Sequence, residues 1–261
     1  TNPDQMKKLL YIGLFTICSI LAACGGSRTG ASMAGGDTIV FKYARDISIV
    51  KYKDYTVAKI RNPWKEGMLL HTYILVPKTE KQIPYHLPEG DLIRTPIDRS
   101  VISTTAHCQL LEYLHAADAI SGVFDLKYIL IPDIHSRVKR GKITDCGNGM
   151  SPEIEKIICL KPQALFLSPF DNSGGYGKIQ TLGVPIVECA DYMETSPLGR
   201  AEWMKFYGLL FGCEKRADSL FLVVSHTYNT LKRKAAGLPL GRSILTERKT
   251  GSVWYCPGGA S

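Results

Sequence analysis

Histidine and acidic side chains are the residues from which a reactive site in this chain could be built. The chain has six histidines, and none of them stands in an HxH or HExxH pair of the kind that binds zinc. Asp171 and Asp191 could serve as a general acid and base, but no nucleophile or set of metal ligands accompanies them. The sequence also lacks GxSxG, P-loop and GxGxxG motifs. It therefore favours a protein that is not an enzyme, with no metal site.

A glycine-rich stretch, "SGGYG" at 173–177, follows "FDN". Backbone N–H groups in such a stretch can hold an anion. The neighbouring Asp and Asn favour a turn instead. We interpret the stretch as a turn, with an anion cradle as the alternative.

Cys24 is the cysteine most clearly placed for covalent modification. Met6, Lys7 and Lys8 precede an apolar run over 9–23, which is shorter than the roughly 20 residues needed to span a bilayer. A basic start, a short apolar core and small residues at its end are typical of a secretory signal. The ending "LAAC" resembles a bacterial lipobox. Residues 1–24 are thus predicted to be an upstream remnant plus a lipoprotein signal, with Cys24 lipidated.

Residues 25–37, rich in Gly, Ser and Ala, are predicted to form a flexible tether between this anchor and the folded part. Of the eight cysteines in the chain, none belongs to a CxxC pair, and we expect most of them to be small buried apolar residues.

The composition indicates a globular protein that can bury a core, since 45% of its residues are hydrophobic. The formal net charge of +8 could attract an anionic ligand or lipid, although a solvated basic surface is the simpler interpretation. No dense Lys/Arg run with interleaved aromatic residues occurs, so we expect no nucleic-acid partner.

Two patterns of secondary structure follow the tether. Residues 38–95 alternate apolar and polar positions, which predicts a β-rich extension of antiparallel hairpins. Residues 96–215 instead alternate short apolar strands with helices, which predicts an α/β lobe with a parallel sheet flanked by helices. Within it we expect a helix over 104–119 with Ala106, Leu110, Leu114 and Ala117 on its apolar face. Another helix is expected to be capped by Ser151 and Pro152.

Apolar residues recur at helical spacing from Arg216 to Ala236 and predict a helix over 216–236. Its length, roughly 30 Å, exceeds what one compact lobe needs. Residues 237–261 look like the beginning of a second, incomplete lobe.

The order of these elements resembles the periplasmic substrate-binding proteins of ABC importers for iron-siderophores, haem and vitamin B12. Three stretches carry the resemblance: "SPEIEKIICLKPQALFLS", "YGKIQTLGVPIVECADY" and the helix ending "YNTLKRKAA". The stretch "CADYMETSPLGRAEWMKFYGLLFG" is similar to the version found in Bacteroides-type lipoproteins. The family fold implied is two α/β lobes, the first of them Rossmann-like, joined by the 216–236 helix as linker, with the ligand clamped between the lobes. Only about 25 residues follow the helix, so we expect a chain truncated in its second lobe.

The resemblance also implies where a ligand would be contacted, because family contacts come from loops that follow the strands. Those positions here are Thr104, Thr105, His107, Phe124, Asp125, Tyr128, Pro169, Phe170, Asp171, Asp191 and Tyr192, faced by Lys249, Trp254 and Tyr255 of the second lobe. Glu155 matches the acid that docks on arginines of the membrane permease.

These features together predict a solute-binding lipoprotein that captures an iron complex (siderophore or haem) or a corrinoid and delivers it to an ABC-type permease. We expect no resident cofactor, a monomer, and a periplasmic location with a bilayer anchor at Cys24. The expected partners are the permease and its ATPase. A receptor for free zinc or manganese and a lipid-anchored scaffold or surface protein remain alternatives.

Overall fold

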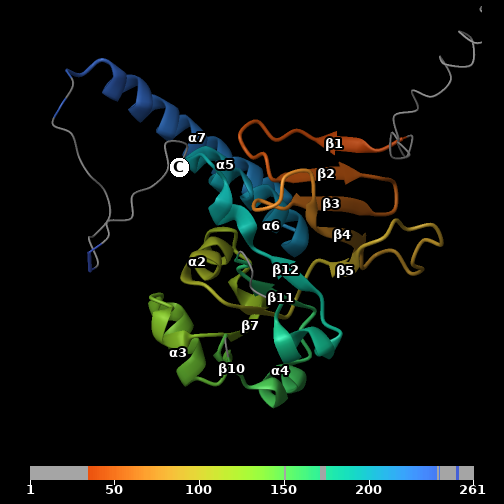
Figure 1. Ribbon diagram of the computed structural model, residues 1–261. Coiled ribbons are helices and arrows are strands. Elements are labelled where there is room, and N and C mark those ends of the chain that lie inside the picture. Colours follow the sequence, from red (N-terminus) through yellow and green to blue (C-terminus); the bar gives the residue numbers. More distant parts are fainter. Residues whose placement is uncertain (1–34, 150, 171–174, 240, 242–250, 253–261) are drawn as a thin grey trace, which may run out of the picture. The chain divides into compact units, whose positions relative to one another are not determined.

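The computed structural model describes residues 35–149, 151–170, 175–239, 241 and 251–252 (Figure 1). The described residues from Asp37 onward belong to one compact unit. No helix among them has both the length and the apolar character required to cross a membrane.

The N-terminal part forms a five-stranded sheet with its strands in chain order. The strands are β1 (Asp37–Ile39), β2 (Ile47–Lys51), β3 (Thr56–Arg61), β4 (Leu69–Pro77) and β5 (Asp91–Thr95). The first four pair antiparallel, as the alternation predicted. However, β5 pairs parallel to β4, so the expectation of hairpins throughout 38–95 was wrong. Residues 78–90, which contain no helix or strand, carry the chain back to the middle of β4, where Asp91 pairs with Tyr73.

A second five-stranded sheet is entirely parallel and has the order β12-β11-β6-β7-β8. Its strands are β6 (Ser100–Ile102), β7 (Ile120–Val123), β8 (Thr144–Asp145), β11 (Ala164–Leu167) and β12 (Ile186–Glu188). A two-stranded hairpin of β9 (Gly147–Asn148) and β10 (Ser151–Pro152) lies beyond β8. The predicted α/β lobe with a parallel sheet is confirmed.

Helices connect these strands. The α-helices are α2 (Thr105–Tyr113), α3 (Pro132–Lys139), α4 (Ile154–Leu160), α5 (Pro197–Glu202), α6 (Met204–Phe211) and α7 (Glu214–Ala236). Short 3-10 helices are η1 (Ala117–Ala119), η2 (Leu126–Tyr128), η3 (Gly177–Leu182) and η4 (Ala190–Met193).

The parallel sheet is covered on both faces, because successive residues of a strand point to opposite sides. Ile102 of β6 and Phe166 of β11 belong to the core that includes residues of α2 and α3. Their neighbours Val101 and Leu165 belong to a separate core with Ile157 of α4 and with η3. Helices α2 and α3, in the connections from β6 to β7 and from β7 to β8, therefore cover one face of the sheet. Helix α4, between β8 and β11, and η3, between β11 and β12, cover the other face. The order of the strands reverses between β6 and β11.

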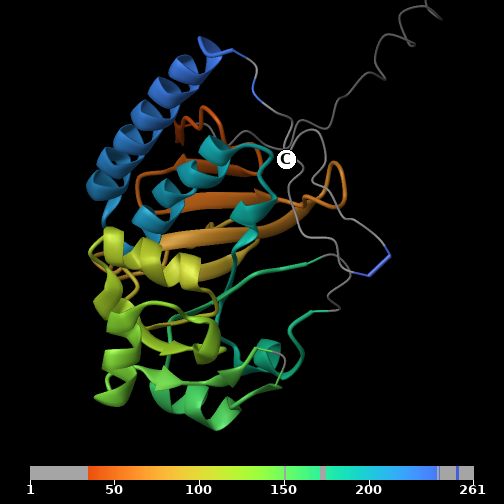
Figure 2. The ribbon, with the colours of Figure 1, turned by 90° about the vertical axis from the view of Figure 1, so that its left-hand side faces the viewer.

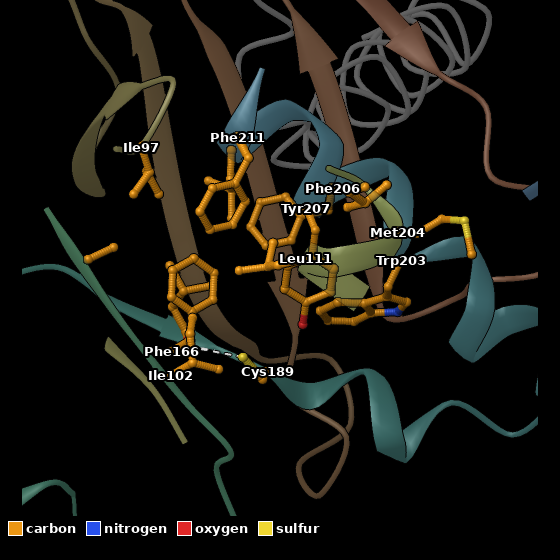
Figure 3. Packing of buried hydrophobic residues seen from close by; sticks show 14 of the residues in the cluster. Ile97, Ile102, Leu111, Phe166, Cys189, Trp203, Met204, Phe206, Tyr207 and Phe211 are labelled. Atoms are coloured by element: carbon orange, nitrogen blue, oxygen red, sulfur yellow. Dashed lines mark hydrogen bonds between the residues drawn. The ribbon is translucent and has the colours of Figure 1, made fainter. Parts of the chain in front are cut away.

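One hydrophobic core joins the two sheets through α6 (Figure 3). The ring of Phe206 lies 5.9 Å from that of Tyr73 in β4, and the ring of Tyr207 lies 6.3 Å from that of Phe166 in β11. The N-terminal sheet thus shares its core with the parallel sheet and is not packed as a separate appendage.

Two expected helices differ from those observed. The helix predicted over 104–119 ends at Tyr113, and His115 with its positive φ of 59° turns the chain. Of the predicted apolar face, Leu110 and Leu114 pack in the core, but Ala106 is exposed. The buried face of α2 also includes His107, Cys108 and Leu111. Ser151 and Pro152 form β10 and do not cap a helix. Gly147, which pairs with Pro152 in this hairpin, has a left-handed φ of +83°, and α4 starts only at Ile154.

The long helix predicted over 216–236 is α7, which extends past the N-terminal sheet (Figure 2). Only Ala217 and Phe221 within it are buried, and Leu222 and Leu231 are 67% and 60% exposed. Its role as a linker remains a prediction, because most of 237–261 lies outside the described residues.

Candidate ligand-binding site

Polar residues gather where β6, β7 and β11 end. Ser103 and Thr104 follow β6, Asp125 follows β7, and Ser168 follows β11. All three strands are parallel, so their carboxyl ends meet at one edge of the sheet. Because the connections from β6 and β11 leave toward opposite faces, this edge is the position where open α/β sheets bind ligands.

A hollow of about 890 Å³ opens at this edge. Hydroxyl groups, glycines and a few charged or apolar side chains line it. The lining residues are Ser103, Thr104, Asp125, Gly149, Ser151, Pro152, Ile154, Glu155, Leu167, Ser168, Phe170, Gly175, Tyr176, Gly177 and Lys178. Its volume is that of a site for a small organic molecule.

Thr104 holds the first wall of the hollow in place. Its backbone is extended, and its Oγ1 accepts a hydrogen bond from the His107 backbone N–H at 3.2 Å, which caps α2. Next to it, the side-chain oxygen of Ser103 is buried without a hydrogen-bond partner among the described residues. A ligand group could satisfy that oxygen, since buried hydroxyls are usually paired.

A buried cluster of polar side chains, His107, Asp191 and Tyr207, contacts Thr104 through His107. His107 Nδ1 lies 2.6 Å from Thr104 Oγ1, and His107 Nε2 lies 2.9 Å from Asp191 Oδ1. The Tyr207 hydroxyl lies 2.9 Å from Nε2 and donates to Asp191 Oδ1 at 3.0 Å. The 3-10 helix η4, helix α2 and helix α6 therefore meet at one imidazole.

The cluster changes the acidity of its members. Burial lowers the pKa of His107, but the neighbouring Cys189 sulfur and the Asp191 carboxylate raise it to about 10. Burial raises the pKa of Asp191, while the hydrogen bond from His107 lowers it, and the net pKa is below the ordinary value. The two groups consequently form a hydrogen-bonded pair of opposite charge at neutral pH.

The opposite wall is held by Tyr176, whose hydroxyl donates to Glu188 Oε2. Burial raises the pKa of Glu188. The backbone of Glu188 is fixed in turn by Tyr73 of β4, whose hydroxyl accepts from the Glu188 N–H at 2.8 Å and donates to the Ile186 carbonyl at 2.9 Å. The N-terminal sheet thereby braces the edge strand that supports the hollow.

Four of the residues singled out from the sequence line the hollow. They are Thr104, Asp125 and Phe170, and also Glu155, which was expected to dock on a permease. Asp125 additionally accepts from the Gly149 N–H at 2.9 Å, which ties the turn after β9 to the site.

The structure places the other predicted contact residues away from the surface of the hollow. Phe124 is completely buried in the core and His107 is 7% exposed, so neither ring faces a ligand. Thr105 Oγ1 donates to the Tyr128 carbonyl and accepts from Leu130 N–H, while the ring of Tyr128 is exposed. Tyr192 donates to the Pro169 carbonyl, and Asp191 pairs with His107. Cys24, Asp171, Lys249, Trp254 and Tyr255 lie outside the described residues.

Sequence reasoning did not assign most of the small residues of the wall to a site, including Ser103, Ser151 and Ser168, and it also missed Lys178. The signal that could have found them is "SGGYG", because Gly175, Tyr176 and Gly177 all line the hollow. Our interpretation of that stretch was a turn, with an anion cradle as the alternative.

Other features of the described residues do not form a comparable site. Two more open grooves lie along α7, both of them lined by Lys42, Tyr43, Asn229 and Arg233. No three His, Cys, Asp or Glu side chains in the described ranges gather closely enough to hold a metal ion. Cys108, Cys146 and Cys189 are free and buried, as expected, whereas Cys159 is free and exposed.

Comparison with known proteins finds relatives among lipoproteins. No protein-family model matches the chain. It is 26% identical to the uncharacterized lipoprotein MJ0878 of Methanocaldococcus jannaschii over 96% of this chain and 68% of that protein. It is also 26% identical to the uncharacterized lipoprotein MJ0872 of the same organism, over 72% of this chain and 50% of that protein.

Solved structures similar to parts of the chain are periplasmic binding proteins. The petrobactin-binding protein YclQ of Bacillus subtilis is 18% identical, with a TM-score of 0.45 over 55% of this chain and 49% of its own. The molybdate-binding protein MolA of Haemophilus influenzae is 18% identical, with a TM-score of 0.46 over 56% of this chain and 51% of its own. The chain thus spans about half the length of these structures.

Proposed function

We propose that this chain binds an iron complex (siderophore or haem) or a corrinoid and belongs to a lipoprotein that delivers this ligand to an ABC-type permease. The observation that carries the proposal is the hollow at the carboxyl ends of β6, β7 and β11. Its walls combine hydroxyl groups with Lys178, with the carboxyl groups of Asp125 and Glu155, and with the half-exposed ring of Phe170. Such walls suit an oxygen-rich ligand that also has flat apolar faces.

The charge state of His107 supports binding over catalysis. Thr104, His107 and Asp191 are arranged as a hydroxyl, an imidazole and a carboxylate in hydrogen-bonding distance, which is the order found in nucleophilic hydrolases. A base must have a free lone pair to accept the hydroxyl proton. With its pKa raised to about 10, His107 is doubly protonated at neutral pH and has no such lone pair.

Membrane attachment and export are supported by the sequence that ends at Cys24 and by the two lipoprotein relatives. A receptor tethered outside the cytoplasm has to pass its ligand to a membrane protein, so the proposal includes a permease and its ATPase. Glu155 on α4 is the proposed docking residue.

Calorimetric titration of the full chain tests the proposal. The ligands are a ferric tris-catecholate, a ferric tris-hydroxamate, haemin and cyanocobalamin. We expect saturable binding of one class at a stoichiometry of one. Phe170→Ala should weaken that binding roughly ten- to a hundredfold, because burying an aromatic face is worth about 1.5–3 kcal/mol. Leu130→Ala is the matched control, since Leu130 is exposed and does not line the hollow.

The outcomes separate the proposal from its alternatives. A folded chain that binds none of the four ligands refutes it. Saturable binding of Zn²⁺ or Mn²⁺ alone would instead favour a free-metal receptor. Binding of neither would favour a scaffold or surface protein.

A further inference from the structure

The hydrogen bonds among Thr104, His107, Asp191 and Tyr207 determine how the Thr104 hydroxyl can interact with a ligand in the hollow. This inference rests on the proposed function of the site. Thr104 Oγ1 lies within hydrogen-bond distance of two nitrogens of His107, the backbone N at 3.2 Å and the ring Nδ1 at 2.6 Å. The backbone N–H can only donate to this oxygen. The direction of the second hydrogen bond depends on whether Nδ1 carries a hydrogen.

The other ring nitrogen always carries one. Nε2 lies 2.9 Å from Asp191 Oδ1, which as a carboxylate oxygen only accepts. The Tyr207 hydroxyl near Nε2 is itself committed to donating to Asp191 Oδ1. A neutral His107 would therefore have its hydrogen on Nε2 and accept the Thr104 hydroxyl hydrogen at Nδ1. A charged His107 would donate from both nitrogens.

We propose that a charged His107, held by Asp191 and Tyr207, turns the hydroxyl hydrogen of Thr104 into the hollow and makes Thr104 a fixed hydrogen-bond donor to an anionic ligand oxygen. When Nδ1 and the backbone N–H both donate to Oγ1, the hydroxyl hydrogen has to point elsewhere. Thr104 lines the hollow, so the hydrogen is available to a ligand there. His107 is then a positioning residue that never touches the ligand.

The surroundings of His107 favour the charged form from each packed element. Asp191 on η4 supplies negative charge, and the buried Cys189 sulfur at the end of β12 also raises the pKa of His107. Tyr207 on α6 is a hydroxyl whose own pKa is raised by burial. No cation is among these neighbours. Loss of the His107 proton would reverse the second hydrogen bond and leave Thr104 only an acceptor toward the hollow.

The protonation state can be measured without a ligand. Long-range ¹H–¹⁵N correlation of histidine side chains in the full chain, assigned with His107→Gln, reports whether each ring nitrogen carries a hydrogen. We expect both ring nitrogens of His107 to carry a hydrogen from pH 6 to 8. Asp191→Asn preserves the shape of the site and should make His107 neutral at pH 7. A bare Nδ1 at pH 7 in the unaltered chain overturns the proposal.

Ligand affinity tests the donor itself. With a ferric tris-catecholate as probe, Thr104→Val should weaken binding about ten- to a hundredfold, the loss expected for one hydrogen bond to a charged group. Thr104→Ser should retain it. Asp191→Asn should weaken binding to a similar degree, and Thr227→Val on the exposed surface of α7 should not. Near-ultraviolet circular dichroism confirms that each variant is folded.

The two measurements distinguish failure of the donor role of Thr104 from failure of the proposed function. Equal affinity of Thr104→Val and the unaltered chain overturns the donor role while leaving the proposed function intact. If no probe binds although His107 is charged at pH 7, the proposed function fails and the orientation of Thr104 stands. A neutral His107 together with hydrolysis of p-nitrophenyl acetate that is lost in Thr104→Val would overturn both and favour a hydrolase.

Discussion

Two buried glutamates hold the loop between β1 and β2 by its backbone. Glu202 accepts from the N–H groups of Lys42, Tyr43 and Ala44 at 2.7–3.0 Å. Glu194 accepts from the N–H groups of Arg45 and Asp46 and from the Trp203 indole. Five successive backbone N–H groups thus donate hydrogen bonds to two carboxylates. Because these carboxylates belong to the α5 region, they attach the N-terminal sheet to the rest of the fold.

Replacing Glu202 with Gln should lower the free energy of unfolding by about 3 kcal/mol at pH 7. An amide presents only one acceptor oxygen, so its NH₂ group would face a backbone donor and leave it unpaired, and hydrogen bonds to charged groups are worth about 1.5–3 kcal/mol each. Urea denaturation measures the change. Glu66→Gln, at an exposed position, is the matched control and should change stability by less than about 0.5 kcal/mol.

The same residue predicts a difference in acid. Burial raises the pKa of Glu202, but the hydrogen bonds from the N–H groups of Lys42, Ala44 and Tyr43 lower it by more than burial raises it. The folded-state pKa therefore lies below the ordinary value. A lowered pKa contributes stability that is fully present above the ordinary pKa and is lost as pH falls through the folded-state value. Between pH 5 and 3 the unaltered chain should therefore lose stability more steeply than Glu202→Gln. Parallel slopes would show that Glu202 does not titrate with folding.

Among the elements, β4 connects the N-terminal sheet to the site. Tyr73 is completely buried, and its hydroxyl bonds to both the Ile186 carbonyl and the Glu188 N–H of β12. Glu188 then accepts from Tyr176 in the wall of the hollow. The sheet that we expected to be an extension without a site role is therefore linked to the hollow through one side chain.

Tyr73→Phe should destabilise the chain by about 1–3 kcal/mol, because it leaves two backbone groups of an edge strand buried without this partner. Hydrogen exchange of the Glu188 amide should also accelerate by more than exchange in β6 at the sheet centre. Tyr85→Phe is the control, since Tyr85 is 92% exposed. Unchanged exchange at Glu188 in Tyr73→Phe would show that β4 does not hold β12.

Much of the parallel lobe could be predicted from the sequence, because its signals are local. Ser196, followed by Pro197, caps α5 through the Gly199 N–H, and Gly212 ends α6 with a φ of 67°. Serine before proline is an ordinary local signal for the start of a helix, and glycine is one for its end. The parallel pairing of β5 could not be predicted, since it depends on a strand brought back by a segment without regular structure. The burial of His107 was also hidden, because its partners Asp191 and Tyr207 lie 84 and 100 residues away.

In the assembled transport system, Glu155 is placed where it could act in ligand binding or in docking on the permease. It lines the hollow and is also exposed on α4, so it could contact either a ligand or a permease. Glu155→Arg should reduce ligand uptake by proteoliposomes containing the permease and its ATPase roughly tenfold, a loss of about 1.4 kcal/mol in docking. Ligand affinity in solution should change less than threefold, and Glu66→Arg should alter neither. A parallel loss of affinity and uptake in Glu155→Arg would assign Glu155 to ligand binding.

Membrane attachment depends on a single thiol if Cys24 is the lipidated residue. Stable anchoring requires more than one acyl chain, and the apolar run before Cys24 is too short to replace them by spanning the bilayer.

When the full chain is exported from bacteria grown with a clickable palmitate analogue, the unaltered protein should carry the label and sediment with membranes. Cys24→Ser should lose the label, retain an uncleaved signal and leave the membrane fraction on carbonate extraction. Cys18→Ser, six residues earlier within the same apolar run, should behave like the unaltered chain. Label that persists in Cys24→Ser, or that disappears in Cys18→Ser, would place the acylation elsewhere and remove the basis for the proposed anchor.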